Sequence, residues 1–303
     1  MTGALAEGLA AASEDAGLET SDLAGVGVGS PGEIDARKGT VSQAKNLPDW
    51  AGSYRLAAEL RKAVDAPVKL GNDVDVATTA EFELGAGKPY RSLLGVFWGT
   101  GVGGGLVLDG KRWTGRGAAG EIGHMVIKRG GARCPCGRRG CMEAYAGRSA
   151  MEARARKAVE KGAKTKLFTI MEERGRDRLT SGIWWRAIRD GDELATELIE
   201  RAVKALGAGI ASAVNLLDVE AVVIGGGLGV RFGDEYVARI EEAMGPHLFV
   251  SDRPPKVQVA KLGDLGGAIG AALLIQNGPG RARSARNASA RSGATARKAP
   301  QAT

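Results

Sequence analysis

The chain has 303 residues, enough for two domains with cores of their own, and 44% of them are hydrophobic, as in ordinary soluble proteins. No apolar run is long and charge-free enough to span a bilayer, and no basic segment leads into an apolar one at the N-terminus. We therefore expect no membrane partner and a cytoplasmic location. The net charge is +7, but residues 277–303 hold six basic and no acidic side chains, so +7 less 6 leaves +1 for the rest. A nearly neutral body argues against a nucleic-acid partner.

The composition favours an α/β fold over an all-helical one, because 47 glycines punctuate short apolar runs and prolines number only 10. Apolar residues that recur every three or four positions predict helices at 4–16, 54–64, 74–84, 150–162, 166–174, 193–217 and 265–275, with another near Tyr236. Short continuous apolar runs predict buried strands at 23–29, 68–70, 93–98, 106–108, 219–224 and 257–260.

Two early strands end in residues that suit a ligand site. The first leads into Ser30-Pro31-Gly32, and the second into Gly71-Asn72-Asp73 at the start of a helix. Open α/β sheets bind ligands beyond the carboxyl ends of their strands, where the Ser30-Pro31-Gly32 turn is expected to lie. Asp73 stands at a strand-to-helix junction and is a candidate to accept a proton. The plainer alternatives are a helix N-cap for Asp73 and simple turn chemistry for Pro31 and Gly32.

Two glycine-rich stretches follow apolar strands later in the chain. Residues 99–105 read Gly-Thr-Gly-Val-Gly-Gly-Gly and predict a hairpin with a glycine-rich bend, whose amides can cradle phosphate oxygens. Glycine can also serve hairpin geometry alone. The second stretch, 225–229, precedes a helix but is not a dinucleotide fingerprint, because Val230 stands where the third glycine belongs.

All three cysteines of the chain fall within eight residues, as Cys134, Cys136 and Cys141, and His124 lies ten residues upstream. Three thiolates and an imidazole form a complete tetrahedral shell for a structural zinc ion. The alternative is three reduced core cysteines. Such cysteines have no reason to gather in a loop of glycine, proline and arginine, so we favour zinc, which also requires reduced thiols.

The zinc motif is flanked by carboxylates, giving Glu-x-Gly-His at 121–124 and Cys-x-Cys-Gly-x-x-Gly-Cys-x-Glu at 134–143. This spacing resembles the repressor, open-reading-frame, kinase (ROK) family and, within it, the bacterial glucokinases. The resemblance implies that His124 and the cysteines bind zinc, while Glu121, Glu143 and the zinc-bound His124 contact a sugar. It also implies a two-lobed actin/hexokinase-like (ribonuclease H-like) ATPase fold.

The same resemblance assigns further roles. Asn72-Asp73 followed by Ala77 resembles the catalytic stretch of the family, which makes Asp73 the general base and Asn72 a substrate contact. Asn46, in Asn-Leu-Pro-x-Trp at 46–50, would contact the sugar. The donor-phosphate residues would be Thr100 and Gly101, and the adenosine of ATP would lie against Gly226 and Gly227. The implied cofactors are structural Zn²⁺, Mg²⁺ and ATP.

One part of the family pattern is missing. Such kinases open with strands and an Asp-x-Gly-Gly-Thr turn that grips the donor phosphates, whereas this chain begins at the first helix. The small lobe is therefore expected to be incomplete at its N-terminus, with an unpaired sheet edge and a weakened donor site. We expect the native start to lie upstream; a truly short, degenerate protein is the alternative.

The domain prediction places a small lobe at 1–92, a large lobe at 93–264 with the zinc element 121–143, and a disordered basic tail at 277–303. The helix 265–276 is expected to pack back on the small lobe. The favoured function is ATP-dependent phosphorylation of a hexose, most simply glucose. N-acetylmannosamine, N-acetylglucosamine and fructose remain open, as do a non-catalytic sugar-binding protein and a sugar-responsive regulator. Family members are usually dimers or tetramers, so a homo-oligomer is expected.

Overall fold

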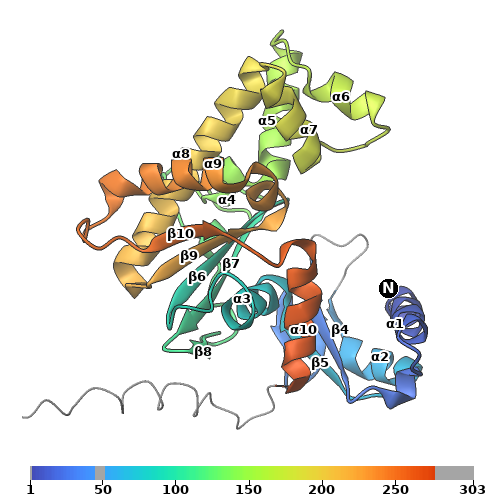
Figure 1. The fold of residues 1–303 in the computed structure, drawn as a ribbon. Helices are drawn as coiled ribbons and strands as arrows, with labels where there is room; N and C mark the ends of the chain where they lie inside the picture. Colours follow the sequence, from blue (N-terminus) through green and yellow to red (C-terminus); the bar gives the residue numbers. More distant parts are fainter. Residues whose placement is uncertain (1, 45–51, 277–303) are drawn as a thin grey trace, which may run out of the picture.

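The computed structural model describes residues 2–44 and 52–276, and it has the α/β architecture that the sequence predicts (Figure 1). The strands are β1 (Val26–Ser30), β2 (Glu33–Asp35), β3 (Thr40–Ser42), β4 (Ser53–Tyr54), β5 (Val68–Asn72), β6 (Leu93–Trp98), β7 (Val102–Leu108), β8 (Lys111–Arg112), β9 (Ala221–Gly225) and β10 (Lys256–Val259). The helices are α1 (Thr2–Asp15), α2 (Leu56–Val64), α3 (Asp73–Glu83), α4 (Glu143–Ala146), α5 (Arg148–Glu160), α6 (Leu167–Glu173), α7 (Ser181–Arg189), α8 (Glu193–Leu217), α9 (Gly226–Met244) and α10 (Gly266–Gln276).

The larger sheet has five strands in the order β10-β9-β6-β7-β8. β10, β9 and β6 run parallel to one another, whereas β6 pairs with β7 and β7 with β8 in antiparallel fashion. Every residue of β9 is buried, which is typical of a parallel strand covered on both faces. Trp98 at the end of β6 stacks on Phe232 of α9, with ring centroids 5.6 Å apart, and so anchors that helix to the sheet.

Two small sheets lie at the other end of the molecule. β1 and β5 pair in parallel, with Val26 opposite Val68, and β2, β3 and β4 form an antiparallel sheet. Within the described residues no strand pairs with the second edge of β1. α10 packs directly on β1, because a Cβ at Gly27 would lie 1.8 Å from the carbonyl oxygen of Ala271.

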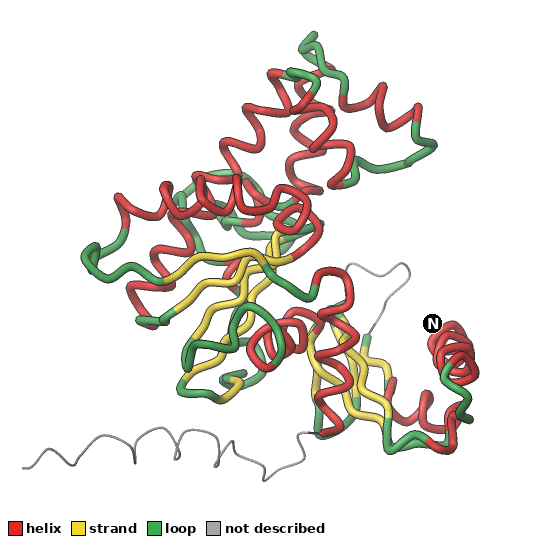
Figure 2. Tube along the Cα trace, viewed as in Figure 1, coloured by secondary structure: helices red, strands yellow, loops and turns green. Residues whose placement is uncertain are grey.

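α3 connects the two sheet systems, since it packs on β6 and β7 on one side and on β1 and β5 on the other. α10 lies alongside it (Figure 1). In Figure 2 the two groups of strands are separate, with these red helices between them, and α5, α6 and α7 lie far from the small sheets. No helix among the described residues is long and apolar enough to cross a membrane.

One prediction about the larger sheet is wrong in detail. The glycine-rich bend was expected to cover 99–105, but β7 already begins at Val102, so the turn is confined to 99–101. The glycines at 103–105 lie within β7, where the lack of a side chain lets neighbouring segments pack closely on the strand. A Cβ at Gly105 would lie 2.3 Å from the hydroxyl of Thr78 on α3, and one at Gly104 would lie 2.7 Å from the carbonyl oxygen of Gly120.

Candidate functional site

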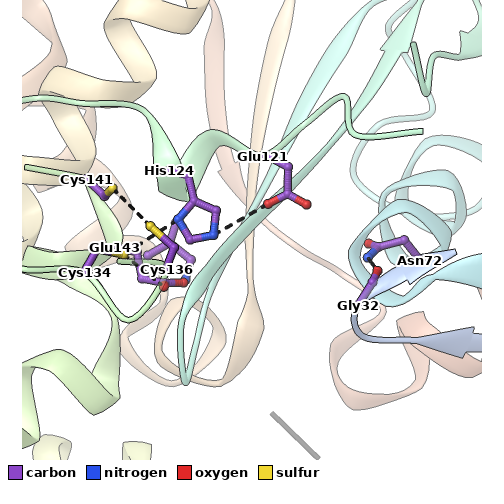
Figure 3. Close-up of polar contacts among 9 residues, drawn as sticks. Gly32, Asn72, Glu121, His124, Cys134, Cys136, Cys141 and Glu143 are labelled. Carbon is purple, nitrogen blue, oxygen red and sulfur yellow. Dashed lines mark hydrogen bonds and ion pairs between the residues drawn. The ribbon is translucent and has the colours of Figure 1, made fainter. Parts of the chain in front are cut away.

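The histidine and the three cysteines converge as the sequence predicts. His124 ends the 3₁₀ turn Ile122–His124, and the cysteines come from the following loop. One ligand atom from each of the four residues lies within 4.8 Å of all the others. The Sγ atoms of Cys136 and Cys141 are 3.7 Å apart, and Nδ1 of His124 is 3.8 Å from Sγ of Cys134 (Figure 3). This donor set fits a tetrahedral zinc ion.

Local backbone geometry explains why the loop can fold into this cluster. Gly137 and Gly140 have φ angles of +92° and +86°, which only glycine adopts at little cost. The amide of Cys134 donates to the carbonyl oxygen of Arg138, at 2.9 Å, and closes the turn. A Cβ at Gly140 would lie 1.9 Å from the carbonyl oxygen of Lys128, so this close approach also requires glycine.

The thiols differ in their environments. Burial raises the pKa of Cys134 to about 12. Burial also opposes the thiolate of Cys136, but the amide and guanidinium of Arg138 donate to it and, together with the neighbouring thiols, lower its pKa to about 6. A basic residue within the loop thus favours the thiolate of Cys136. A bound cation would favour the others in the same way.

Two carboxylates lie against the cluster. Oε2 of Glu121 is 3.9 Å from Nε2 of His124, on the ring edge opposite the thiols. Glu143, the first residue of α4, directs Oε1 to within 3.8 Å of Sγ of Cys134, while its Oε2 accepts a hydrogen bond from the amide of Val102 at 2.9 Å. In Figure 3, Glu121 lies between the cysteine cluster and Asn72.

The strand β5 delivers Asn72 and Asp73 on the far side of Glu121. Asn72 is the N-cap of α3, because its Oδ1 accepts from the amides of Val74 and Asp75 at 3.0 and 3.3 Å. Its Nδ2 donates to the carbonyl oxygen of Gly32 at 3.3 Å and so holds the Ser30-Pro31-Gly32 turn beside it (Figure 3). The N-cap alternative for Asp73 is therefore wrong, since its neighbour fills that role.

Asp73 is the first residue of α3. Burial raises the pKa of its carboxyl, and the amide of Val74, which donates to Oδ1 at 3.0 Å, partly offsets that shift. A carboxylate whose pKa is raised accepts a proton more readily, which suits a general base.

Asp75 is a second carboxylate here, and the sequence reasoning missed it. It is 9% exposed, and its Oδ1 has no hydrogen-bond partner among the described residues. Burial raises its pKa to about 6; the charge of Arg112 lowers it, and the charges of Glu121 and Asp73 raise it further. The Asp-x-Asp spacing after a strand was the only signal in the sequence that could have indicated a second acid.

The two glycine-rich stretches come together at one end of the larger sheet. Thr100 and Gly101 form the turn between β6 and β7, and Gly226 and Gly227 open α9 directly after β9. A Cβ at Gly99 would lie 3.8 Å from the amide nitrogen of Gly227, so the stretches are neighbours. A Cβ at Gly101 would lie 2.2 Å from Oε2 of Glu143, which places this turn against the cysteine cluster. Among the predicted site residues, Asn46 alone lies outside the described residues.

Comparison with known proteins agrees with this arrangement. A model of the ROK family matches residues 1–278. The chain belongs to the ROK family. It is 32% identical over 253 residues to a glucokinase of Thermotoga maritima, covering 83% of this chain and 78% of that enzyme. It is 35% identical over 257 residues to an N-acetylmannosamine kinase of Haemophilus influenzae, covering 83% of this chain and 77% of that kinase.

A solved structure of a ROK family protein has the same fold as this chain. A ROK family glucokinase from Streptomyces griseus, in complex with glucose and AMPPNP, aligns with a TM-score of 0.74 at 30% identity, covering 85% of this chain and 83% of that one. The predicted actin/hexokinase-like fold is thereby confirmed.

Proposed function

We propose that this ROK protein is an ATP-dependent hexose kinase that converts glucose to glucose 6-phosphate. The glucokinase and N-acetylmannosamine kinase relatives support sugar kinase activity, and they differ in the sugar that their names give. The observation that carries the proposal is the position of Glu143. One of its oxygens faces the cysteine cluster and the other accepts from the first amide of β7, so a candidate sugar contact adjoins the candidate phosphate turn.

In the proposed reaction, five side chains bind the sugar: Asn46, Asn72, Glu121, His124 and Glu143. Asp73 takes the proton from its 6-hydroxyl. The oxygen then forms a bond to the γ-phosphorus of ATP while the bond to the β,γ-bridging oxygen breaks, and ADP leaves. Thr100 and Gly101 hold donor phosphates, and Gly226 and Gly227 lie against the adenosine. Magnesium that enters with ATP supplies charge compensation on the phosphate oxygens.

The zinc ion would be structural. His124, Cys134, Cys136 and Cys141 would hold it, and its role is to fix the loop that carries Glu121 and Glu143. We further propose lobes at 1–92 and 93–264 that close over the sugar and exclude water, which competes as an acceptor. A dimer or tetramer in the cytoplasm completes the proposal, and light scattering tests the oligomeric state.

The test is a panel of glucose, N-acetylmannosamine, N-acetylglucosamine and fructose with ATP, scored by ADP release and by the mass of the sugar phosphate. We expect glucose to give the highest kcat/KM. The Asp73→Asn variant should bind glucose normally but lose turnover by about 10²–10⁴-fold. Sugar binding without turnover in the wild type would instead identify a sugar-binding or regulatory protein. Turnover on another hexose would correct the substrate alone.

A further inference from the structure

Arg148 lies at the junction of the segments that the proposed function assigns to the donor. It is the first residue of α5, and its amide donates to the carbonyl oxygen of Gly99 at 3.0 Å. Its Nη2 donates to Oγ1 of Thr100 at 2.8 Å, and its Nη1 donates to Oγ of Ser181 at 3.3 Å. The guanidinium thus spans from the turn after β6 to the first residue of α7.

The contact with Ser181 places Arg148 near the second glycine-rich stretch, residues 225–229. A Cβ at Gly227 would lie 3.0 Å from Oγ of Ser181, so the start of α7 and the start of α9 lie together. Arg148 therefore stands beside both stretches proposed to hold ATP. None of the glycine patterns in the sequence pointed to it.

The guanidinium of Arg148 forms no ion pair with an acidic side chain in the described part of the chain. Within the described residues no carboxylate lies within 4 Å of its guanidinium, and both of its side-chain partners are hydroxyl groups. Burial lowers its pKa, the charge of Arg178 lowers it further, and the charge of Glu152 partly offsets this shift. The nearby Glu152 is already engaged, by Arg156 at 2.6 Å and by the amide of Leu179 at 2.9 Å. An arginine stays protonated in this setting, so a partly desolvated cation faces the candidate phosphate turn.

We propose that Arg148 binds the terminal phosphate of the donor and stabilises its charge during transfer. The inference rests on the proposed function, because it concerns the same donor site. Thr100 and Ser181 hold the planar guanidinium in one orientation. Its remaining N–H groups have no hydrogen-bond partner among residues 2–44 and 52–276, so they can donate charge-assisted hydrogen bonds to phosphate oxygens. Phosphoryl transfer depends on positioning and charge stabilisation, and arginine supplies both.

A purely structural role makes a different prediction. If Arg148 only clamps the turn to α7, its loss should weaken every ligand of the donor site alike. If it contacts the terminal phosphate, its loss should lower the affinity for ATP most, the affinity for ADP less and the affinity for adenosine least. Affinities of the full-length protein for adenosine, ADP and ATP separate the two roles.

Calorimetric titrations should compare the wild type with Arg148→Ala, Arg148→Lys and Arg156→Ala. The last is a matched control, because Arg156 lies on the same helix but pairs with Glu152. We expect Arg148→Ala to lose about 10–100-fold in affinity for ATP, less for ADP, and less than about twofold for adenosine. The ATP affinity of Arg148→Lys should lie between those of the wild type and Arg148→Ala, since lysine keeps the charge but lacks the planar set of N–H donors. The Arg156→Ala control should match the wild type.

Kinetics add a second readout. In Arg148→Ala, kcat at saturating ATP should fall by about 10²–10³-fold with the KM for sugar unchanged, and millimolar guanidinium should restore part of the loss. Equal losses for ATP and adenosine, or an unchanged ATP affinity, would overturn the proposal. If the alanine variant does not fold, the lysine variant carries the same comparison. If the variants show this affinity pattern but the wild type does not turn over, the kinase function is refuted, and only the phosphate-binding role of Arg148 stands. A wild type that binds no ATP would refute both.

Discussion

Nε2 of His124 lies 3.9 Å from Oε2 of Glu121, on the ring edge opposite the thiols. A carboxylate that accepts a hydrogen bond from the second nitrogen of a metal-binding imidazole fixes the orientation of the ring, and Glu121 is the carboxylate nearest to that nitrogen. We therefore expect Glu121→Gln to lower zinc affinity about 10-fold while leaving one zinc ion per chain. Competition with a chromophoric chelator measures the affinity. Glu160→Gln, an exposed change on α5, is the control. If both variants hold zinc equally well, Glu121 does not support the metal ligand.

The pH dependence of turnover tests Asp73 against Asp75. Burial raises the pKa of Asp73 above 3.8, so kcat/KM should rise with pH as this carboxyl loses its proton, along a limb that lies above pH 3.8. Asp73→Asn should lower turnover by about 10²–10⁴-fold, whereas Asp75→Asn should retain it together with the limb. The reverse result would identify Asp75 as the base, since its pKa of about 6 also suits that role.

Asp75 makes a prediction about stability. Its folded-state pKa, about 6, lies above its ordinary value of 3.8, so its ionised form is costly in the fold. The cost is fully present above about pH 6 and vanishes as pH falls below the unfolded pKa. Asp75→Asn should therefore raise the free energy of unfolding at pH 8 by about 1–3 kcal/mol, and by almost nothing near pH 3.5. Urea titrations at both pH values measure it.

Asp35 offers a control of opposite sign. The amide of Lys38 lowers its pKa in the folded state, so Asp35→Asn should not stabilise the protein at pH 8. Equal effects of the two substitutions would mean that burial of Asp75 is not the cause.

Glu81 joins α3 to the segment that precedes α10. The residue is 2% exposed, and its carboxylate accepts hydrogen bonds from the amides of Ala86, Lys261 and Leu262, at 2.9, 3.1 and 2.8 Å. Glu81→Ala leaves these amides without their acceptor and should cost about 2–4 kcal/mol in urea unfolding. Glu59→Ala removes a surface pair with Lys62 and should cost less than about 1 kcal/mol. Similar costs for both would show that water replaces the Glu81 carboxylate.

Local pattern predicted most of the longer elements but not α7 or the short strands β2, β3, β4 and β8. The periodicity of 193–217 gave the full extent of α8, and the apolar run 93–98 gave β6, because packing on one continuous core decides both. The convergence of the four candidate zinc ligands was also predictable, since the close spacing of the three cysteines in one short loop is itself the signal.

Other features depend on contacts between distant segments. The glycines of β7 looked like a bend, because the sequence alone does not indicate that Thr78 and Gly120 pack on them. Asp75 looked like an ordinary helix residue until Arg112 and Glu121 were found near it. No sequence motif marks Arg148, because the role proposed for it depends on its contacts with Thr100 and Ser181, which are remote in the sequence.

Glu143 has a further consequence through its hydrogen bond to the amide of Val102. A sugar that hydrogen-bonds to this carboxylate would compete with, or tighten, its hold on the turn that carries Thr100. Sugar and nucleotide would then bind as thermodynamically linked ligands. Because linkage is reciprocal, the sugar would change the affinity for the nucleotide by the same factor as the nucleotide changes the affinity for the sugar. The size of that factor, measured with a non-reactive ATP analogue, would report how firmly one glutamate couples the two halves of the site.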